Sequence, residues 1–186
     1  KACHQTQPSS KLKLFAASEE MNSIEEFVEA PISTLDLEEM EKRGLKKGDV
    51  ARAPWSGDYW PYSSGLLGVR YMDVDFVVLE DWHSRFEYIT KFPVSRVLEK
   101  NGQSGVDFLS PSEKYDLIVG DMDFALTQSM WAQGKEYYDI DGKVEEWMGL
   151  CHGRAPASIV EPRHVRIVEV VSPDLKWKVV FNPSEI

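Results

Sequence analysis

Cys151 lies in a short stretch, Trp147-Met-Gly-Leu-Cys-His-Gly153, whose residue types suit nucleophilic chemistry. The thiolate is the reactive form of cysteine, and the N-terminus of a helix favours the thiolate through its partial positive charge and free N–H groups. Gly149 and Gly153 allow a tight turn and the close approach of a substrate. Residues 155–159 (Ala-Pro-Ala-Ser-Ile) continue the pattern, so we expect Cys151 to open a buried helix. An acyl group attacked there would leave its oxyanion near unpaired backbone donors.

Two other interpretations of Cys151 stay open. The chain has two cysteines, Cys3 and Cys151, and an even count in a secreted protein is also typical of one disulfide. A buried structural thiol is common as well. The local residue types alone therefore leave a nucleophile, a Cys3–Cys151 disulfide and a buried thiol as alternatives.

The four histidines are His4, His83, His152 and His164, and none has the spacing of a zinc site. His152 follows Cys151 directly, and neighbours on a helix point about 100° apart, so it is a poor candidate for the general base. His164 comes later in the sequence and could reach back, since cysteine nucleophiles usually take their base from a distant segment. Surface or structural roles are the simpler interpretation of each histidine taken alone.

The acidic residues are densest at Asp139, Asp141 and Glu145, around Gly142. A hard cation such as calcium takes six to eight oxygen ligands, which an acidic loop with a glycine can supply in part. The spacing does not match an EF-hand, and solvated acids of a turn are the alternative. We treat Asp139, Asp141 and Glu145 as candidate calcium ligands.

Composition excludes several classes of function. The 186 residues carry a net charge of −10, which argues against a nucleic-acid partner because phosphate binding needs clustered Lys and Arg. A hydrophobic content of 42% is enough for a core, yet no run reaches the roughly 18 apolar residues of a membrane span. The chain begins at Lys1 rather than at a methionine, so we expect a processed, secreted protein whose signal peptide has been removed.

The N-terminal part of the chain is predicted to be mainly helical. We expect an arm over residues 1–22, followed by one domain over residues 23–186. The aromatic loop at 53–71 carries Trp55, Tyr59, Trp60 and Tyr62, which either wall a groove or pin the loop onto the core. Ser23 and Ser33/Thr34 resemble helix N-caps, Gly44 and Gly120 resemble helix ends, and Pro93 breaks a helical pattern. These signals predict helices at 24–29, 35–43, 80–100 with a break at 92–93, 111–119, and 124–137.

The last segment is predicted to be a hairpin. Residues 165–171 and 175–181 are β-type runs on either side of Ser172-Pro-Asp174, and Leu175, Trp177 and Val179 alternate as in a half-buried strand. The order of elements indicates an α+β fold, with a helical N-terminal part packed on an antiparallel sheet.

Three separated stretches of the chain resemble one known family. The longest is Tyr137-Tyr-Asp-Ile-Asp-Gly-Lys-Val-Glu-Glu-Trp-Met-Gly-Leu-Cys-His-Gly-Arg-Ala-Pro-Ala-Ser-Ile-Val-Glu-Pro162. The others are Pro54-Trp-Ser with Tyr59-Trp-Pro and Gly65, and Leu109-Ser-Pro-Ser-Glu-Lys-Tyr-Asp-Leu117 with Gly120-Asp121. Together they resemble the transglutaminase elicitor family of secreted oomycete and bacterial transglutaminases, over about positions 53–186.

This resemblance implies acyl transfer in a papain-like arrangement of Cys, His and Asp. The cysteine attacks the carboxamide of a protein glutamine, ammonia leaves, and a lysine amine or water accepts the acyl group. By its place in the motif, Cys151 is the implied nucleophile, and we expect Trp55, Trp60, Trp147, Gly149 and His152 to be its neighbours. The family also implies calcium, protein substrates that supply glutamine and lysine, and secretion. A cysteine protease or amidase, and a non-catalytic binding module with a Cys3–Cys151 disulfide, are the alternative functions.

Two features depart from the family pattern. Arg154 stands where the family usually has tryptophan, which predicts different local packing or substrate contact. The catalytic histidine and aspartate are expected downstream of Ile186, so His164 is not assigned as the base. We therefore expect this chain to be the N-terminal portion of an enzyme that is completed by a second polypeptide, made by cleavage after Ile186.

Overall fold

The structure is a computed structural model that describes residues 36–45, 47–50 and 52–186, apart from the side chain of His152. The expected arm at 1–22, the expected helix at 24–29, the expected caps at Ser33/Thr34, and Cys3 and His4 lie outside the described residues. The chain divides into two compact units, residues 1–50 and 51–186, which are described separately. The expected boundary between residues 22 and 23 stays a prediction.

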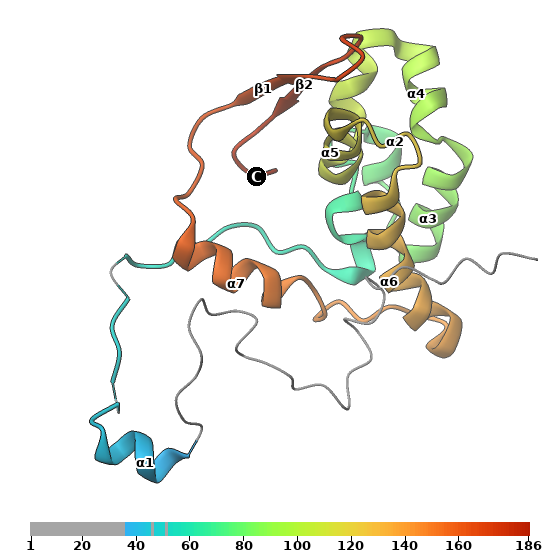
Figure 1. Ribbon diagram of the computed structural model, residues 1–186. Coiled ribbons are helices and arrows are strands. Elements are labelled where there is room, and N and C mark those ends of the chain that lie inside the picture. The colour runs from blue at the N-terminus through green and yellow to red at the C-terminus, as the bar shows by residue number, and fades with distance from the viewer. Residues whose placement is uncertain (1–35, 46, 51) are drawn as a thin grey trace, which may run out of the picture. The chain divides into compact units, whose positions relative to one another are not determined.

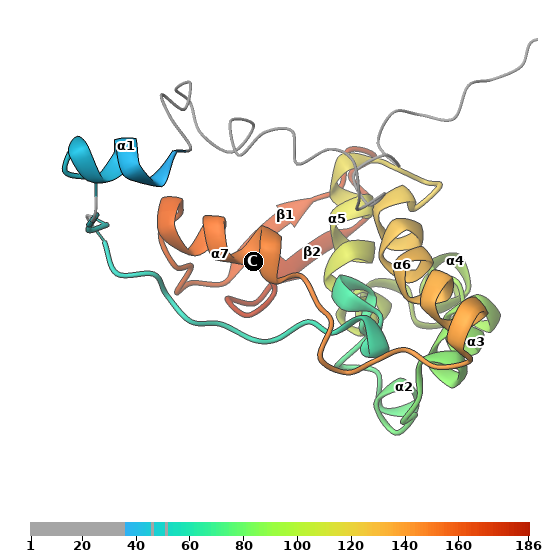
Figure 2. The same ribbon diagram turned by 90° about the horizontal axis from the view of Figure 1, so that it is seen from below.

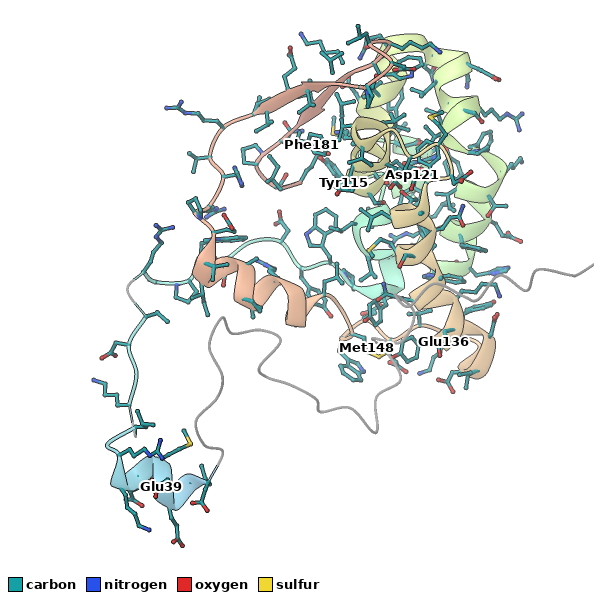
Figure 3. All side chains as sticks on the ribbon, in the orientation of Figure 1. Glu39, Tyr115, Asp121, Glu136, Met148 and Phe181 are labelled. Carbon is teal, nitrogen blue, oxygen red and sulfur yellow. The ribbon has the colours of Figure 1, made fainter. Side chains whose placement is uncertain are left out.

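In the first unit, helix α1 spans Leu37–Lys42 (Figure 3, which labels Glu39). Its N-cap is Asp36, whose carboxylate accepts a hydrogen bond from the N–H of Glu39 at 2.9 Å. Gly44 follows the end of the helix with φ of +74°, a conformation that glycine adopts without strain. The predicted end at Gly44 is therefore confirmed.

The second unit is mainly helical and ends in a small sheet, as Figure 1 shows. The α+β class predicted from the sequence is confirmed. Helices α5 and α6 lie side by side in both views (Figures 1 and 2), and β2 packs against α5 and η5. The elements are η3 (Tyr62–Ser64), η4 (Leu66–Gly68), α2 (Val74–Val77), α3 (Trp82–Lys91), α4 (Val94–Asn101), η5 (Gly102–Phe108), α5 (Pro111–Val119), α6 (Ala125–Asp141), α7 (Cys151–Val160), β1 (Val168–Val171) and β2 (Lys178–Phe181).

The helix boundaries follow local sequence signals. Pro93 separates α3 from α4 as predicted, because proline disfavours helical geometry in the preceding residue. Ser110 and Glu113 form a reciprocal capping box at the start of α5, and Gly120 ends the helix with φ of +75°. Helix α6 runs four residues beyond the predicted end at Tyr137 and stops before Gly142.

Three apolar clusters make up the core. The first joins α4, η5, α5 and β2, the second joins η3, η4 and α6, and the third packs aromatic rings between α2, α3 and α6. In the third cluster, Gly134 lies so close to Trp82 that an added Cβ would meet the indole nitrogen at 2.2 Å. Gly65 and Gly68 are similarly close to the Trp131 ring. Because glycine has no side chain, the Trp82 and Trp131 rings can pack directly against these backbone positions and become buried.

Helix α5 carries a buried ion pair. The guanidinium of Arg70 and the carboxylate of Glu113 approach to 2.5 Å, with side-chain exposures of 0% and 4%. Arg70 also donates to the carbonyl of Phe92 at 2.8 Å, and Glu113 accepts from the N–H of Ser110 at 2.8 Å. A buried charge is tolerated when it is paired and its remaining hydrogen-bonding groups are satisfied, and both conditions hold here.

Two more charged residues of α5 are buried. Lys114 donates to Glu185 at 2.6 Å, and Glu185 also accepts from the backbone N–H of Asn182 at 2.6 Å. Asp116 accepts from the hydroxyl and the N–H of Thr127 at 2.7 and 3.0 Å. Burial raises the pKa of Asp116, and these hydrogen bonds oppose that rise. Polar contacts thus join α5 to α6 and to the last residues of the chain.

The hairpin is present but shorter than predicted. Strands β1 and β2 pair antiparallel, with Val168 opposite Phe181 and Val171 opposite Lys178. The expectation that Leu175 lies in a half-buried strand is wrong, because Leu175 is in the turn with φ of +61° and is 81% exposed. Val179 is fully buried, as the alternation predicted. Among the described residues, no helix has the length and apolar character needed to cross a membrane.

Tyr88 contributes to the stability of the second unit, and this contribution is lost at alkaline pH. Its hydroxyl donates to the Asp73 carboxylate at 3.0 Å. Burial and the Asp73 contact raise its pKa from 10 to about 12. The folded state therefore favours the neutral phenol, so this contribution is complete below pH 10 and is lost as the pH rises through about 12.

In a titration followed at the phenolate absorbance band, Tyr88→Phe should remove a step near pH 12. Asp73→Asn, which keeps a helix-capping side chain, should move that step to lower pH; an unmoved step would contradict this account.

Candidate active site

The segment before α7 is fixed by pairing with the aromatic loop. Pro61 and Gly149 form an antiparallel bridge, and the N–H of Tyr62 donates to the carbonyl of Met148 at 2.8 Å. The N–H of Leu150 donates to the carbonyl of Trp60 at 3.4 Å. These bonds set the backbone position of the residue that precedes Cys151.

Apolar packing holds the same segment against the core. Met148 and Leu150 pack on the cluster formed by Tyr62, Leu66 and Met130 (Figure 3, which labels Met148). Tyr62 in turn stacks on Tyr137 of α6, with ring centroids 5.8 Å apart. Cys151 therefore follows an anchored residue, although its own side chain faces solvent.

Cys151 is the first residue of α7, and its thiol is free and exposed. The prediction that Cys151 opens a helix is confirmed. The prediction that this helix is buried is wrong: Ser158 is buried, whereas Ile159 and Val160 are 43% and 70% exposed. The segment's small residues and Pro156 do not form a wide apolar stripe, and polar contacts near its middle and its end hold the helix instead.

Those polar contacts come from the aromatic loop. The indole N–H of Trp55 donates to the carbonyl of Glu161 at 2.9 Å. Arg154 donates to the carbonyl of Asp58, and an added Cβ at Gly57 would meet the Arg154 guanidinium at 2.7 Å. Arg154, where the resemblance implied tryptophan, thus holds the loop against α7.

Two tyrosines lie within the electrostatic influence of the thiol. Burial raises the pKa of the Tyr59 hydroxyl, and Cys151 raises it further. Burial also raises the pKa of Tyr62, with smaller contributions from Tyr137 and Cys151. Both phenols therefore stay protonated, and the Tyr59 hydroxyl donates to the carbonyl of Glu146 at 3.2 Å. The sequence flagged this aromatic loop but named Trp55 and Trp60 as neighbours of Cys151, rather than these tyrosines.

The first turn of α7 offers backbone donors. The N–H groups of Cys151, His152 and Gly153 have no acceptor within the helix, as at any helix start. Leu150 is the N-cap, and its side chain has no oxygen with which to accept from them. The turn can therefore stabilise negative charge that develops next to the thiol.

The other predicted neighbours of Cys151 take the following positions in the structure. Trp60 approaches through its backbone carbonyl, which bonds to Leu150, and Trp55 contacts the far end of α7. Trp147 is 75% exposed. Gly149 is tightly enclosed, and the side chain of His152 is not described. Whether these residues contact a substrate stays a prediction.

The candidate calcium ligands do not gather into one site. Asp139 pairs with Lys135 at 2.5 Å on the surface of α6, and Glu145 pairs with Lys143 at 2.5 Å. In the described part of the chain, no three His, Cys, Asp or Glu side chains, those of Asp139, Asp141 and Glu145 included, form a group that could hold a metal ion. These residues therefore do not fit calcium as a set, and no step of the chemistry below depends on it.

The other described histidines take surface positions. His83 stacks on Tyr138 with ring centroids 5.0 Å apart and lies 3.4 Å from the carboxylate of Glu87. His164 is exposed in the segment between α7 and β1. These placements agree with the surface and structural roles expected of each.

Replacing Gly149 by alanine is expected to destabilise the second unit by about 1–3 kcal/mol, because the new Cβ overpacks a closed contact. That Cβ would lie 2.6 Å from the Trp60 carbonyl oxygen and 2.8 Å from the Tyr59 ring. Urea unfolding measures the change. The matched control is Gly153→Ala, where the new Cβ meets nothing within 4 Å and the helix should gain about 0.5–1 kcal/mol. Equal stability of the two variants would contradict the enclosed position of Gly149.

A comparison of the sequence with models of known protein families identifies the family of this chain. The family model described as Transglutaminase elicitor matches residues 20–180. The chain belongs to the transglutaminase elicitor family. No curated protein and no solved structure matches it. The match includes Cys151, the aromatic loop and α5, so the resemblance noted in the sequence is confirmed. The papain-like arrangement stays a prediction.

Proposed function

We propose that this chain carries the nucleophile of a protein-glutamine gamma-glutamyltransferase, and that Cys151 is that nucleophile. The observation that carries the proposal is the free, exposed thiol at the first residue of α7, within the stretch that matches the transglutaminase elicitor family. An anchored backbone and the open first turn of a helix support it.

In this mechanism, the Cys151 thiolate attacks the carboxamide carbon of a glutamine side chain. The carbonyl oxygen becomes an oxyanion, which the first-turn N–H groups of α7 can stabilise. The C–N bond then breaks, ammonia leaves after gaining a proton, and a thioester remains on Cys151. A lysine amine attacks the thioester, loses a proton and forms an isopeptide bond, and the thiolate is released.

The proton carriers are expected to be a histidine and an aspartate, as the family resemblance implies. A second polypeptide that supplies them is part of the proposal, as are a secreted location and an accessory role for calcium. Full turnover by the 186-residue chain alone would contradict the need for a second polypeptide.

Glutamine recognition can be tested by covalent labelling. A peptide in which 6-diazo-5-oxo-norleucine replaces glutamine should label Cys151, as read by intact mass and peptide mapping. The matched control is the same peptide with the diazoketone one methylene shorter, in place of asparagine. We expect labelling by the longer probe to be at least about tenfold faster, since a misplaced carbonyl loses alignment with the thiolate. Equal rates would overturn the proposal.

A cysteine protease or amidase would use the same thioester with water as the acceptor. The two functions separate when glutamine protein is offered with a fluorescent primary amine, because a transferase incorporates the amine in preference to hydrolysis. For the alternative of a Cys3–Cys151 disulfide, the structure has Cys151 as a free thiol. Cys3 lies outside the described residues.

A further inference from the structure

The two edges of the hairpin differ. The side-chain amide of Gln103 donates to the carbonyl of Lys178 at 2.7 Å and accepts from its N–H at 3.1 Å. Both backbone groups of Lys178 therefore point away from β1, and Gln103 closes the outer edge of β2 at this residue. Because these groups alternate in direction along a strand, those of Val179 and Phe181 point toward β1.

The register then fixes which groups of β1 face outward. Val170 and Val168 lie opposite Val179 and Phe181, so their backbone groups point toward β2. The N–H and C=O groups of Glu169 and Val171 consequently point to the outer edge of β1. In the described part of the chain the sheet contains β1 and β2 alone, so this edge has no strand beside it. An open edge is a ready template for another strand.

An apolar cavity lies next to the open edge. It has a volume of about 300 Å³ and is formed between the hairpin and α5 (Figure 3, which labels Tyr115 and Phe181). Its apolar lining includes Val168 and Val170 of β1, together with Leu67, Tyr115, Ile118 and Phe181. Side chains of one strand alternate between the two faces of a sheet, so a strand added to β1 would direct every second side chain to the face that holds this cavity.

The charge beside β1 is opposite to that of the chain as a whole. Arg163 and Arg166 are exposed just before β1, and among the described residues neither forms an ion pair. The lysines of the hairpin are neutralised: Lys178 pairs with Glu169 at 2.8 Å and Lys176 with Asp174 at 3.5 Å. The whole chain carries −10. Two uncompensated arginines in an acidic molecule favour a partner with carboxylates at this position.

We propose that the outer edge of β1 binds an extended acidic segment of a partner protein by strand addition. The segment hydrogen-bonds to the backbone of Glu169 and Val171. Its alternate apolar side chains contact the cavity beside Val168 and Val170, and its carboxylates meet Arg163 and Arg166. Backbone bonds supply affinity in this mode of recognition, and pockets for alternate side chains supply specificity.

A second copy of the chain fits this edge less well. In the symmetric register centred on Glu169, the two Glu169 carboxylates would lie directly opposite each other, which is destabilising. The proposed site does not use Cys151, so it can be tested separately from the proposed catalytic function.

The test measures peptide binding by fluorescence anisotropy on the Cys151→Ala protein, which rules out covalent capture. The probe is a labelled seven-residue peptide that alternates valine and threonine and ends in two glutamates. We expect saturable binding, with a Kd below about 1 mM. The protein variants Val171→Pro, which removes one outward N–H, and Arg163→Glu with Arg166→Glu should each weaken binding at least about tenfold. Thermal melting checks that each variant remains folded.

Two altered peptides test the backbone and charge contacts, and a measurement of molecular mass tests for a dimer. The peptide N-methylated on alternate amides, and the peptide that ends in two lysines, should each bind at least about tenfold more weakly. Equal binding of either one would overturn the proposal, as would a Kd above about 1 mM for the acidic probe. Light scattering that shows a dimer, dissociated by Val171→Pro, would assign the edge to a second copy and also overturn it.

Discussion

Glu113→Gln is expected to lower the free energy of unfolding by about 3–5 kcal/mol, the usual cost of removing one partner from a buried ion pair. The Arg70 side chain is fully buried, so its guanidinium would keep its charge without a carboxylate to balance it. The glutamine Oε1 can still accept from the N–H of Ser110 and keep the capping box of α5, but its amide N–H₂ then faces the Arg70 guanidinium, donor against donor. Urea unfolding followed by tryptophan fluorescence measures the loss.

The matched control for this substitution is Asp139→Asn, which makes the same acid-to-amide change in the exposed pair with Lys135. That variant should lose at most about 0.5 kcal/mol, because water already solvates both charges. Combining Glu113→Gln with Arg70→Met should recover part of the loss, since no unpaired charge then remains in the core. A loss below about 1 kcal/mol for Glu113→Gln would mean that Arg70 reaches water.

Cys151→Ala is expected to lower the incorporation of a fluorescent primary amine into a glutamine-bearing protein by at least about 10⁴-fold. Without the sulfur no thioester can form, whatever supplies the proton carriers. Stability should change by no more than about 0.5 kcal/mol, because the Cys151 side chain is exposed and packs against no core cluster.

The second cysteine provides the control for that result. Cys3→Ser should leave amine incorporation unchanged if Cys151 acts as a free nucleophile. Absence of amine incorporation by the unaltered protein, with a Cys151 thiol that is alkylated only after a reductant is added, would instead support the disulfide alternative. Retention of activity in Cys151→Ala would refute its assignment as the nucleophile.

Local signals in the sequence were enough to predict many helix boundaries. Pro93, the start of α5 at Pro111, Gly120 and the start of α7 at Cys151 all depend on signals within one or two turns of the chain. Such boundaries depend on backbone geometry and on side chains close in sequence, so the prediction required no knowledge of distant contacts.

Burial could not be predicted in the same way. Glu113, Lys114 and Asp116 have the composition of a solvated helix face, yet all three are buried. Their partners Arg70, Glu185 and Thr127 are 43, 71 and 11 residues away in the sequence, and nothing local identifies them. The opposite error occurred at α7, where apolar composition suggested burial although the contacts that hold the helix are polar. The two tyrosines near Cys151 were missed for the same reason, since the pairing of Pro61 with Gly149 brings them there.

The pairing of Lys114 with Glu185 also limits how far the described end of the chain can be shortened. A protease that removed Glu185 would leave the Lys114 ammonium inside the protein without a counter-charge, and would free Asn182 from its acceptor. The loss would destabilise α5, which also carries Glu113 of the Arg70–Glu113 pair and Asp116, whose carboxylate contacts α6. Removal of Glu185 by proteolysis should therefore lower the free energy of unfolding by about 3–5 kcal/mol, the cost of breaking a buried ion pair.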